Sequence, residues 1–452
     1  MRSINPATSE VIRDYPEHSA EEVGQIIRDV HTSWERWKES TFESRSELMK
    51  KAAHILHDKK EHYAQLMTLE MGKLSRESMA EVEKCAWVCD YYADHAMELL
   101  QDEVIPTDAS RSFVTFQPIG VVLAVMPWNF PFWQVFRFAA PALMAGNAAV
   151  LKHASNVSGC AIVIEEIFRE AGFPANLFRT LMIPSQGVEA VIANPLIAAA
   201  TLTGSEFAGS EVASVAGKYL KKTVLELGGS DPFIVLHDAD MEAAVKTAVT
   251  ARMLNQGQSC IAAKRFIVMD SISDQFESQL KTAFESLRIG DPTNPETQVG
   301  PMARPDLVDE IEKQVSASIA AGARLVTGGK RPERAGCYYT PTILADVSEG
   351  MAVYSQETFG PVVSLIKVHD EAEAIRVAND SDFGLGGCIW TRDLRRGEEI
   401  ARKIETGAVF VNGMTKSDPR LPFGGIKKSG YGRELAQYGI KEFVNIKTIW
   451  IS

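Results

Sequence analysis

Several short apolar runs in the middle of this chain end in a polar or glycine-rich turn, and this pattern limits the fold more than any other feature. The runs are 121–125 before Asn129, 148–151 before Lys152, and 199–202 before Thr203. Helical patterns at 160–171 and 186–193 separate them. Alternating strands and helices predict a parallel, doubly wound sheet, in which ligands bind beyond the carboxyl ends of the strands.

The 452 residues are too many for one ordinary core, so two or three domains are expected. The pattern is helical from 19 to about 100, and after Gly229 it restarts with a strand at 233–236 and a helix at 241–254. Two other segments, 111–117 and 443–451, are rich in β-formers and predict strands that pair in a small flap. The predicted division is 1–110 with 126–228, then 229–415, and an arm of 111–125 with 436–452.

Composition excludes several classes of partner and location. A net charge of −12 without a basic run argues against nucleic acid and anionic membrane surfaces, and the apolar runs are too short to span a bilayer. The N-terminus has no signal-peptide pattern. Six cysteines in so long a chain are no disulfide framework, and we expect a reducing cytoplasm. Cys85 and Cys89 are predicted to be buried helix residues, so no metal site is expected.

Cys260, Glu226 and Asn129 form the candidate catalytic set. Cys260 lies in Asn255-Gln-Gly-Gln-Ser-Cys260, Glu226 in Leu225-Glu-Leu-Gly-Gly-Ser230, and Asn129 in Pro127-Trp-Asn-Phe-Pro131. A thiolate, a carboxylate base acting through water and an amide donor for an oxyanion are what acyl transfer through a thioester needs. The alternatives are that Cys260 is a small core residue and that Asn129 caps the following helix.

These three motifs resemble those of the aldehyde dehydrogenase superfamily. Thr358-Phe-Gly-Pro361, Leu202-Thr-Gly-Ser205 and Pro422-Phe-Gly-Gly-Ile-Lys-Lys-Ser-Gly430 also match, in the family's order, so the resemblance covers nearly the whole chain. It implies two doubly wound parallel-sheet domains, one binding a dinucleotide (1–110 with 126–228) and one catalytic (229–415). It also implies an arm that packs on a neighbouring subunit, in a homodimer or homotetramer.

The chain has no Gly-x-Gly-x-x-Gly fingerprint, but Gly204-Ser-Glu-Phe-Ala-Gly209 is a turn that could open a helix toward a pyrophosphate. The resemblance implies that Lys152 and Glu357 bind ribose and that Phe359 lies near the nicotinamide. It further places the cofactor-binding residues Trp128, Ser155, Thr203, Gly204, Ser205 and Gly209. NAD-preferring relatives commonly carry glutamate where this chain has Ser155. Serine does not repel a 2′-phosphate, so with Lys152 and His153 adjacent we expect NADP, with NAD as the alternative.

Arg137 is the main clue to the substrate. It lies in the aromatic segment 132–138, where its guanidinium needs an anion, and Trp133 is one turn earlier. An aldehyde at Asn129 could place a carboxylate near Arg137, roughly 12 Å further along a helix. With Ser417, this pattern resembles the short-form succinate-semialdehyde dehydrogenases. The alternative is an internal ion pair between Arg137 and an acidic residue.

The expected reaction is therefore oxidation of succinate semialdehyde to succinate. The alternatives are another ω-carboxylated aldehyde, a simple aliphatic aldehyde, or a catalytically idle structural protein on the same fold. A CoA-acylating reaction is disfavoured because Glu226 supplies a base for water.

Overall fold

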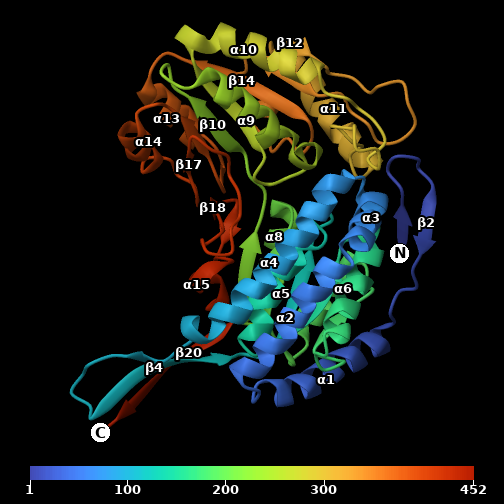
Figure 1. Ribbon diagram of the computed structural model, residues 1–452, viewed down its shortest axis with the longest axis vertical. Coiled ribbons are helices and arrows are strands. Elements are labelled where there is room, and N and C mark those ends of the chain that lie inside the picture. Colours follow the sequence, from blue (N-terminus) through green and yellow to red (C-terminus); the bar gives the residue numbers. More distant parts are fainter.

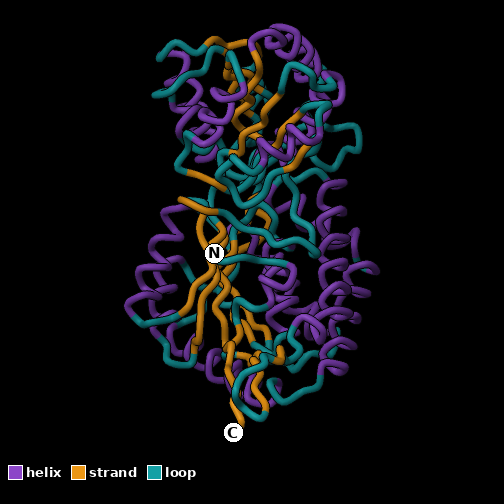
Figure 2. Tube along the Cα trace, turned by 90° about the vertical axis from the view of Figure 1, so that its left-hand side faces the viewer, coloured by secondary structure: helices purple, strands orange, loops and turns teal.

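The computed structural model describes residues 1–452 and contains two large sheets, one above the other in Figure 1, with a narrow arm extending from the lower part. The same sheets appear as two groups of orange strands in Figure 2. The α/β class predicted from the alternating pattern is confirmed.

The lower sheet has six strands in the order β19-β9-β8-β5-β6-β7, and all its pairs are parallel except β19 with β9. The three predicted apolar runs are β5, β6 and β8, and they are almost entirely buried because helices cover both faces of the sheet. The strands are β5 (Val121–Met126), β6 (Ala148–His153), β7 (Phe178–Thr180), β8 (Ile197–Thr203), β9 (Lys222–Glu226) and β19 (Gly430–Tyr431).

The predicted helical layer before residue 100 consists of four helices that pack with the lower sheet. They are α1 (Ala20–Trp37), α2 (Phe42–Asp58), α3 (Lys60–Met71) and α4 (Ser75–Leu99). The other elements around this sheet are α5 (Trp133–Met144), η1 (Ser155–Val157), α6 (Ser158–Glu170), η2 (Ser185–Gly187), α7 (Val188–Ala193), α8 (Glu206–Lys218) and α15 (Ala436–Ile440). Every residue of α5 is buried, and α4 packs against it.

The upper sheet has seven strands in the order β12-β13-β14-β11-β10-β16-β17, parallel except for β12. Its strands are β10 (Asp231–Val235), β11 (Ala263–Met269), β12 (Arg324–Thr327), β13 (Thr342–Ala345), β14 (Val362–Val368), β16 (Cys388–Trp390) and β17 (Phe410–Val411). Its helices are α9 (Met241–Met253), η3 (Leu254–Gly257), α10 (Asp270–Glu285), α11 (Pro305–Ala320), α12 (Ala352–Ser355), α13 (Glu371–Asn379) and α14 (Leu394–Ala401). Two apolar clusters lie on opposite faces of this sheet.

The arm is a three-stranded antiparallel sheet of β3 (Glu103–Val104), β4 (Arg111–Pro118) and β20 (Val444–Ile451), as the flap prediction required. Two of its predicted limits are wrong. Residues 121–125 belong to β5 of the lower sheet, because the chain turns at Gly120, whose φ is +136°. Residues 436–440, which were assigned to the arm, form helix α15 and pack against α4 and α5.

Two small antiparallel sheets of two strands each complete the chain: β1 (Arg2–Ile4) with β2 (Val11–Asp14), and β15 (Phe383–Gly384) with β18 (Ile426–Lys427). All six cysteines are free thiols, and Cys85 and Cys89 are buried on α4 as predicted. No helix combines the length and the apolar character that crossing a membrane would require.

Candidate functional site

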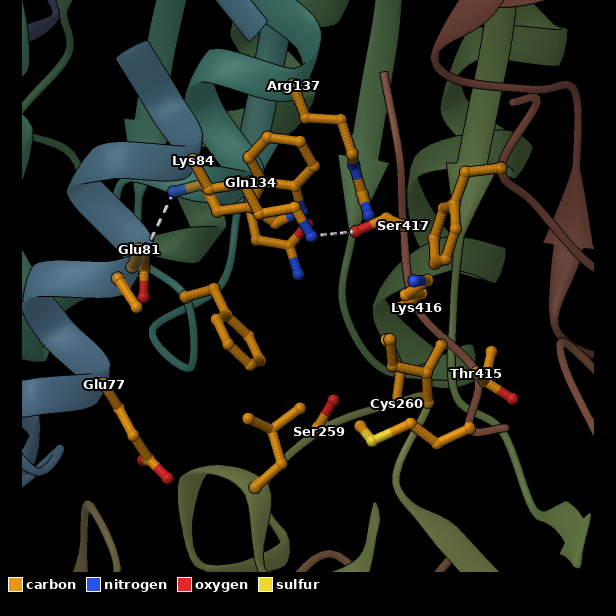
Figure 3. Close-up of a pocket in the computed structure, with 17 residues that line it drawn as sticks. Glu77, Glu81, Lys84, Gln134, Arg137, Ser259, Cys260, Thr415, Lys416 and Ser417 are labelled. Atoms are coloured by element: carbon orange, nitrogen blue, oxygen red, sulfur yellow. Dashed lines mark hydrogen bonds between the residues drawn. The ribbon is translucent and has the colours of Figure 1, made fainter. Parts of the chain in front are cut away.

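Cys260 lies where two cavities meet, beyond the carboxyl ends of the lower-sheet strands. The first cavity, of about 200 Å³, lies between α4, α5 and the segment 414–417, and Figure 3 shows its lining. The second, of about 330 Å³, is bordered by the turns after β5, β8 and β9. Asn129 lines the second cavity, and Trp133, Arg137 and Ser417 line the first. The structure therefore brings together residues that were singled out in distant parts of the sequence.

The loop before Cys260 has an unusual backbone. Asn255, Gln256 and Gly257 all have positive φ angles, of 51°, 56° and 76°. A Cβ atom on Gly257 would lie 2.2 Å from the carbonyl oxygen of Gly360, so only glycine fits there. Arg252 donates a hydrogen bond of 2.8 Å to the carbonyl of Thr358. The cysteine loop and the Thr358-Phe-Gly-Pro361 motif are thus held against each other.

The thiol of Cys260 is difficult to ionise in this environment. Burial raises its pKa to about 12, and the positive charges of Arg137 and Lys264 oppose this rise. Lys264 is itself buried and donates to the carbonyl oxygen of Cys260 at 2.9 Å. Formation of a thiolate therefore requires a proton acceptor or a further positive charge near the sulfur.

The side chain of Asn129 is buried, and one of its amide hydrogens is donated to the carbonyl of Gln258 at 3.1 Å. The alternative that Asn129 caps α5 is not what the structure shows. Instead, Glu81 accepts from the backbone amides of Phe132 and Trp133, both at 2.9 Å. The remaining amide hydrogen of Asn129 is available for an oxyanion on a group bound to Cys260.

Glu226 is the last residue of β9, and its side chain is almost fully buried. Burial, followed by the nearby charge of Glu434, raises the pKa of Glu226 well above its ordinary value, while Arg137 lowers it. A Cβ atom on Gly424 would lie 2.6 Å from Glu226 Oε1, so the carboxyl group rests against bare backbone. Glu226 lines neither cavity, and a water molecule has to connect it to Cys260.

Arg137 is not the unpaired cation that the sequence suggested. It forms a buried ion pair with Glu434, donates to Thr203 Oγ1 at 3.2 Å, and lies 4.7 Å from the ring centre of Phe423. Glu434 follows the glycine-rich segment at 422–430, far from Arg137 in sequence. The internal ion pair considered above is therefore present, although Arg137 still borders the first cavity.

The second cavity collects most of the predicted cofactor residues. It is lined by Trp128, Thr203, Gly204, Ser205, Glu357 and Phe359. The rings of Trp128 and Phe359 meet edge to face at 5.8 Å. Glu357 accepts from the backbone amide of Gly229 at 3.0 Å and lies 3.4 Å from Lys264. As predicted, helix α8 opens directly after this turn, with Ser205 as its N-cap.

Lys152 lies apart from that set, in a third cavity of about 410 Å³ between α7 and α8. Ser155 is exposed close by on η1. The suggested contribution of His153 is wrong, because its ring is buried, bonded to the carbonyl of Pro131 at 2.8 Å, and has its pKa lowered to about 4 by burial. Gly209 serves packing, since a Cβ atom there would meet Leu227 at 2.6 Å.

Sequence reasoning missed Lys84, Glu77, Lys264 and Glu434 at this site. Lys84 and Glu77 come from α4 and line the first cavity. Neither belongs to a motif, so nothing local in the sequence distinguishes them from solvated helix residues. Glu434 could have been found from the sequence, because it lies just beyond a glycine-rich motif and a buried Arg137 requires an acidic partner.

Known proteins resemble this chain over its whole length. The protein-family model described as "Aldehyde dehydrogenase family" matches residues 1–449. A protein of a Synechocystis species, named probable succinate-semialdehyde dehydrogenase [NADP(+)], is 54% identical over 452 residues, covering 100% of both chains. The succinate-semialdehyde dehydrogenase [NADP(+)] of Mycobacterium leprae is 49% identical over 455 residues, also covering 100% of both.

Among solved structures, the succinic semialdehyde dehydrogenase of Streptococcus pyogenes in complex with NADP+ superposes with a TM-score of 0.98. It is 41% identical, and the match covers 100% of this chain and 99% of that one. In this chain Cys260 and Asn129 border the cavity that the Leu202-Thr-Gly-Ser205 turn also lines. The chain therefore belongs to the aldehyde dehydrogenase family.

Proposed function

We propose that this enzyme oxidises succinate semialdehyde to succinate with NADP, through a thioester on Cys260. The observation that carries the proposal is the position of Cys260 between two cavities. One cavity has positively charged side chains at a distance from the sulfur, and the other is bordered by the Leu202-Thr-Gly-Ser205 turn. The names of the relatives from Synechocystis and Mycobacterium leprae support both the substrate and the cofactor.

In the proposed reaction, the Cys260 thiolate attacks the aldehyde carbon, and Asn129 with the backbone amide of Cys260 stabilises the resulting oxyanion. A nicotinamide dinucleotide, when bound in the second cavity, supplies the hydride acceptor that the oxidation requires. Glu226 then takes a proton from the water that attacks the thioester, which releases the acid and regenerates the thiol.

The residues present fit a dinucleotide. The backbone at Gly204 borders the second cavity without a side chain, so a phosphate can approach the N-terminus of α8. Lys152 has neither an ion pair nor a side-chain hydrogen bond within the protein, and burial lowers its pKa. An unpaired ammonium group in a cleft favours an anionic or hydroxyl-rich ligand such as a phosphorylated ribose.

We expect Ser155→Glu to shift cofactor preference from NADP toward NAD. A carboxylate at this exposed position would repel a 2′-phosphate, so we expect kcat/KM for NADP to fall about tenfold or more while that for NAD is retained. Steady-state kinetics with both cofactors measure this, and Ser278→Glu on α10 is the matched exposed control. A parent enzyme that prefers NAD would refute the assignment of Ser155.

The arm supports a homo-oligomer, in which β4 and β20 would pack on a second copy. Ile446, Trp450 and Ile451 are exposed apolar side chains on β20, and burying them would favour association. We expect a chain truncated before β20 to be smaller in solution by multi-angle light scattering than the full chain. A full chain that is monomeric at micromolar concentration would contradict this.

The six free thiols support our placement of the enzyme in a reducing cytoplasm.

We also propose that the lower-sheet region holds the dinucleotide and that the upper-sheet region carries the nucleophile.

The direct test of the whole proposal is a panel of aldehydes assayed with both cofactors by absorbance of the reduced nicotinamide. Succinate semialdehyde with NADP should give the highest kcat/KM. If another carboxylated or a simple aldehyde is clearly better, the substrate assignment fails. No turnover with any aldehyde would favour an idle structural protein.

A further inference from the structure

We propose that Lys84 binds the carboxylate of the substrate, together with the hydroxyl of Ser417. This inference rests on the proposed function and adds a specificity residue to it. It also changes the role of Arg137, whose charge is already compensated by Glu434 within the protein.

Lys84 is well placed for this role. It extends from α4 into the first cavity, which it shares with Cys260, and its Nζ donates to Ser417 Oγ at 2.7 Å. The ammonium group lies 4.2 Å from the ring centre of Trp133. Figure 3 shows Lys84 and Arg137 reaching toward Ser417 from two different helices, above the position of Cys260. A substrate bound at the sulfur would direct its far end toward this group.

The positive charge of Lys84 has no acidic partner, since no carboxylate forms a salt bridge with its Nζ. The two carboxylates whose charges act on it, Glu81 and Asp418, are both paired with other groups. Glu81 pairs with Lys73 and accepts from the amides that begin α5. Asp418 pairs with Arg420 at 2.7 Å. Lys416 also lines the cavity without an ion pair, but it is exposed to solvent, so Lys84 is the half-buried cation here that lacks a counter-ion.

A half-buried ammonium group without a counter-ion is costly, and a bound anion would remove that cost. Burial, followed by the adjacent charge of Arg137, lowers the pKa of Lys84 to about 8. Lys84 donates one of its three hydrogens to Ser417, which leaves two for a ligand. Because Ser417 accepts from Lys84, its own hydrogen is also free to be donated. These donors suit a carboxylate.

The test compares Lys84→Met with the parent enzyme on succinate semialdehyde and on butanal, which have the same chain length but differ in the terminal charge. We expect kcat/KM for succinate semialdehyde to fall about ten- to a hundredfold, mainly through KM, and that for butanal to stay within about twofold. Lys84→Arg should recover part of the loss. Lys51→Met, at an exposed position on α2, is the matched control.

Arg137→Ala should behave differently. It would leave Glu434 buried without its partner beside Glu226, so we expect losses on both aldehydes. Equal losses of Lys84→Met on both substrates, or no loss on either, would overturn the assignment of Lys84. A parent enzyme that does not prefer succinate semialdehyde would refute the proposed function separately.

A binding measurement keeps the two failures distinct. Titration calorimetry of succinate into the parent and into Lys84→Met needs no turnover. If the variant binds succinate at least about tenfold more weakly than the parent, the result supports Lys84 as the carboxylate-binding residue, even if the preferred aldehyde differs from the one proposed. Equal succinate binding by both proteins overturns it.

The pH dependence provides a second readout. The ratio of kcat/KM for succinate semialdehyde to that for butanal cancels the ionisation of Cys260, which affects both substrates. Because Lys84 is charged below its lowered pKa, this ratio should fall as pH rises through about 8. Of the groups near Lys84, Cys85 has its pKa raised by burial, Asp418 is held ionised by Arg420, Glu81 is paired with Lys73, and Arg137 with Glu434. Glu77 lines the same cavity, and burial raises its pKa to about 7, so it can add a fall at lower pH in both proteins. The fall through about 8 should be absent from Lys84→Met, and the same fall in both proteins would contradict the proposal.

Discussion

Cys260→Ala should lower aldehyde oxidation by about 10⁴-fold or more, the scale on which removing a covalent nucleophile acts. Cofactor binding should change little, since Cys260 lies where the two cavities meet and no dinucleotide contact is assigned to its sulfur. Steady-state assays and a fluorescence titration with NADP measure the two effects.

A conservative control separates chemistry from packing. Cys388 is also a free cysteine, buried on β16, and it lines neither cavity, although its sulfur lies 3.8 Å from Thr415 Oγ1 behind the wall of the first. We expect Cys388→Ala to retain most of the activity. Substantial turnover by Cys260→Ala would remove the covalent mechanism, whatever the remaining residues do.

Glu226→Gln should slow hydrolysis of the thioester by about 10²- to 10⁴-fold and have a smaller effect on acylation. Glutamine preserves the shape of the side chain against Gly424 but cannot accept a proton from water. Rapid-mixing kinetics should therefore show a fast burst of reduced nicotinamide, followed by a slow steady rate.

Glu226→Gln should also change how the rate of deacylation depends on pH. Burial raises the pKa of Glu226, so the ionised form that acts as a base becomes more abundant as pH increases. Deacylation by the parent should therefore accelerate with pH through that raised pKa, and the Glu226→Gln variant should lack this increase. An identical profile in both proteins would assign the base to another group.

The strands and the catalytic set could be predicted because their signals are local. The runs at 121–125, 148–151 and 199–202 are apolar and end in turns, which marks them as buried parallel strands. Residues at the ends of such strands meet at one edge of the sheet, so the sequence alone predicts Asn129 and Thr203 there.

Two errors had local physical causes. Consecutive residues of a strand point to opposite faces, so Lys152 and His153 cannot both face the same cavity. Lys152 borders the cleft and His153 is buried behind it. The arm was extended too far because only the short turn at Gly120 separates β4 of the arm from β5 of the lower sheet, so the limit was drawn at the end of β5 instead of at this turn.

The charge pairing in the substrate cavity could not be predicted from the sequence. Lys84 and Ser417 are 333 residues apart in the chain, and no pattern in either segment indicates the other. The partner of Arg137 also depends on how the segment after Gly430 folds back against β9. Whether Lys84 or Arg137 is free to bind a substrate depends on which of them is paired with a carboxylate, and that pairing is determined by the folded structure.

The central claim is that a succinyl thioester forms on Cys260. Its most direct test is to mix Glu226→Gln with succinate semialdehyde and NADP, quench at the end of the burst, and identify the modified peptide by mass spectrometry. We expect one reduced nicotinamide and one succinyl group per active site, the latter on the peptide that contains Cys260. Reduced nicotinamide without an acyl group on Cys260, or an acyl group on another residue, would contradict the account.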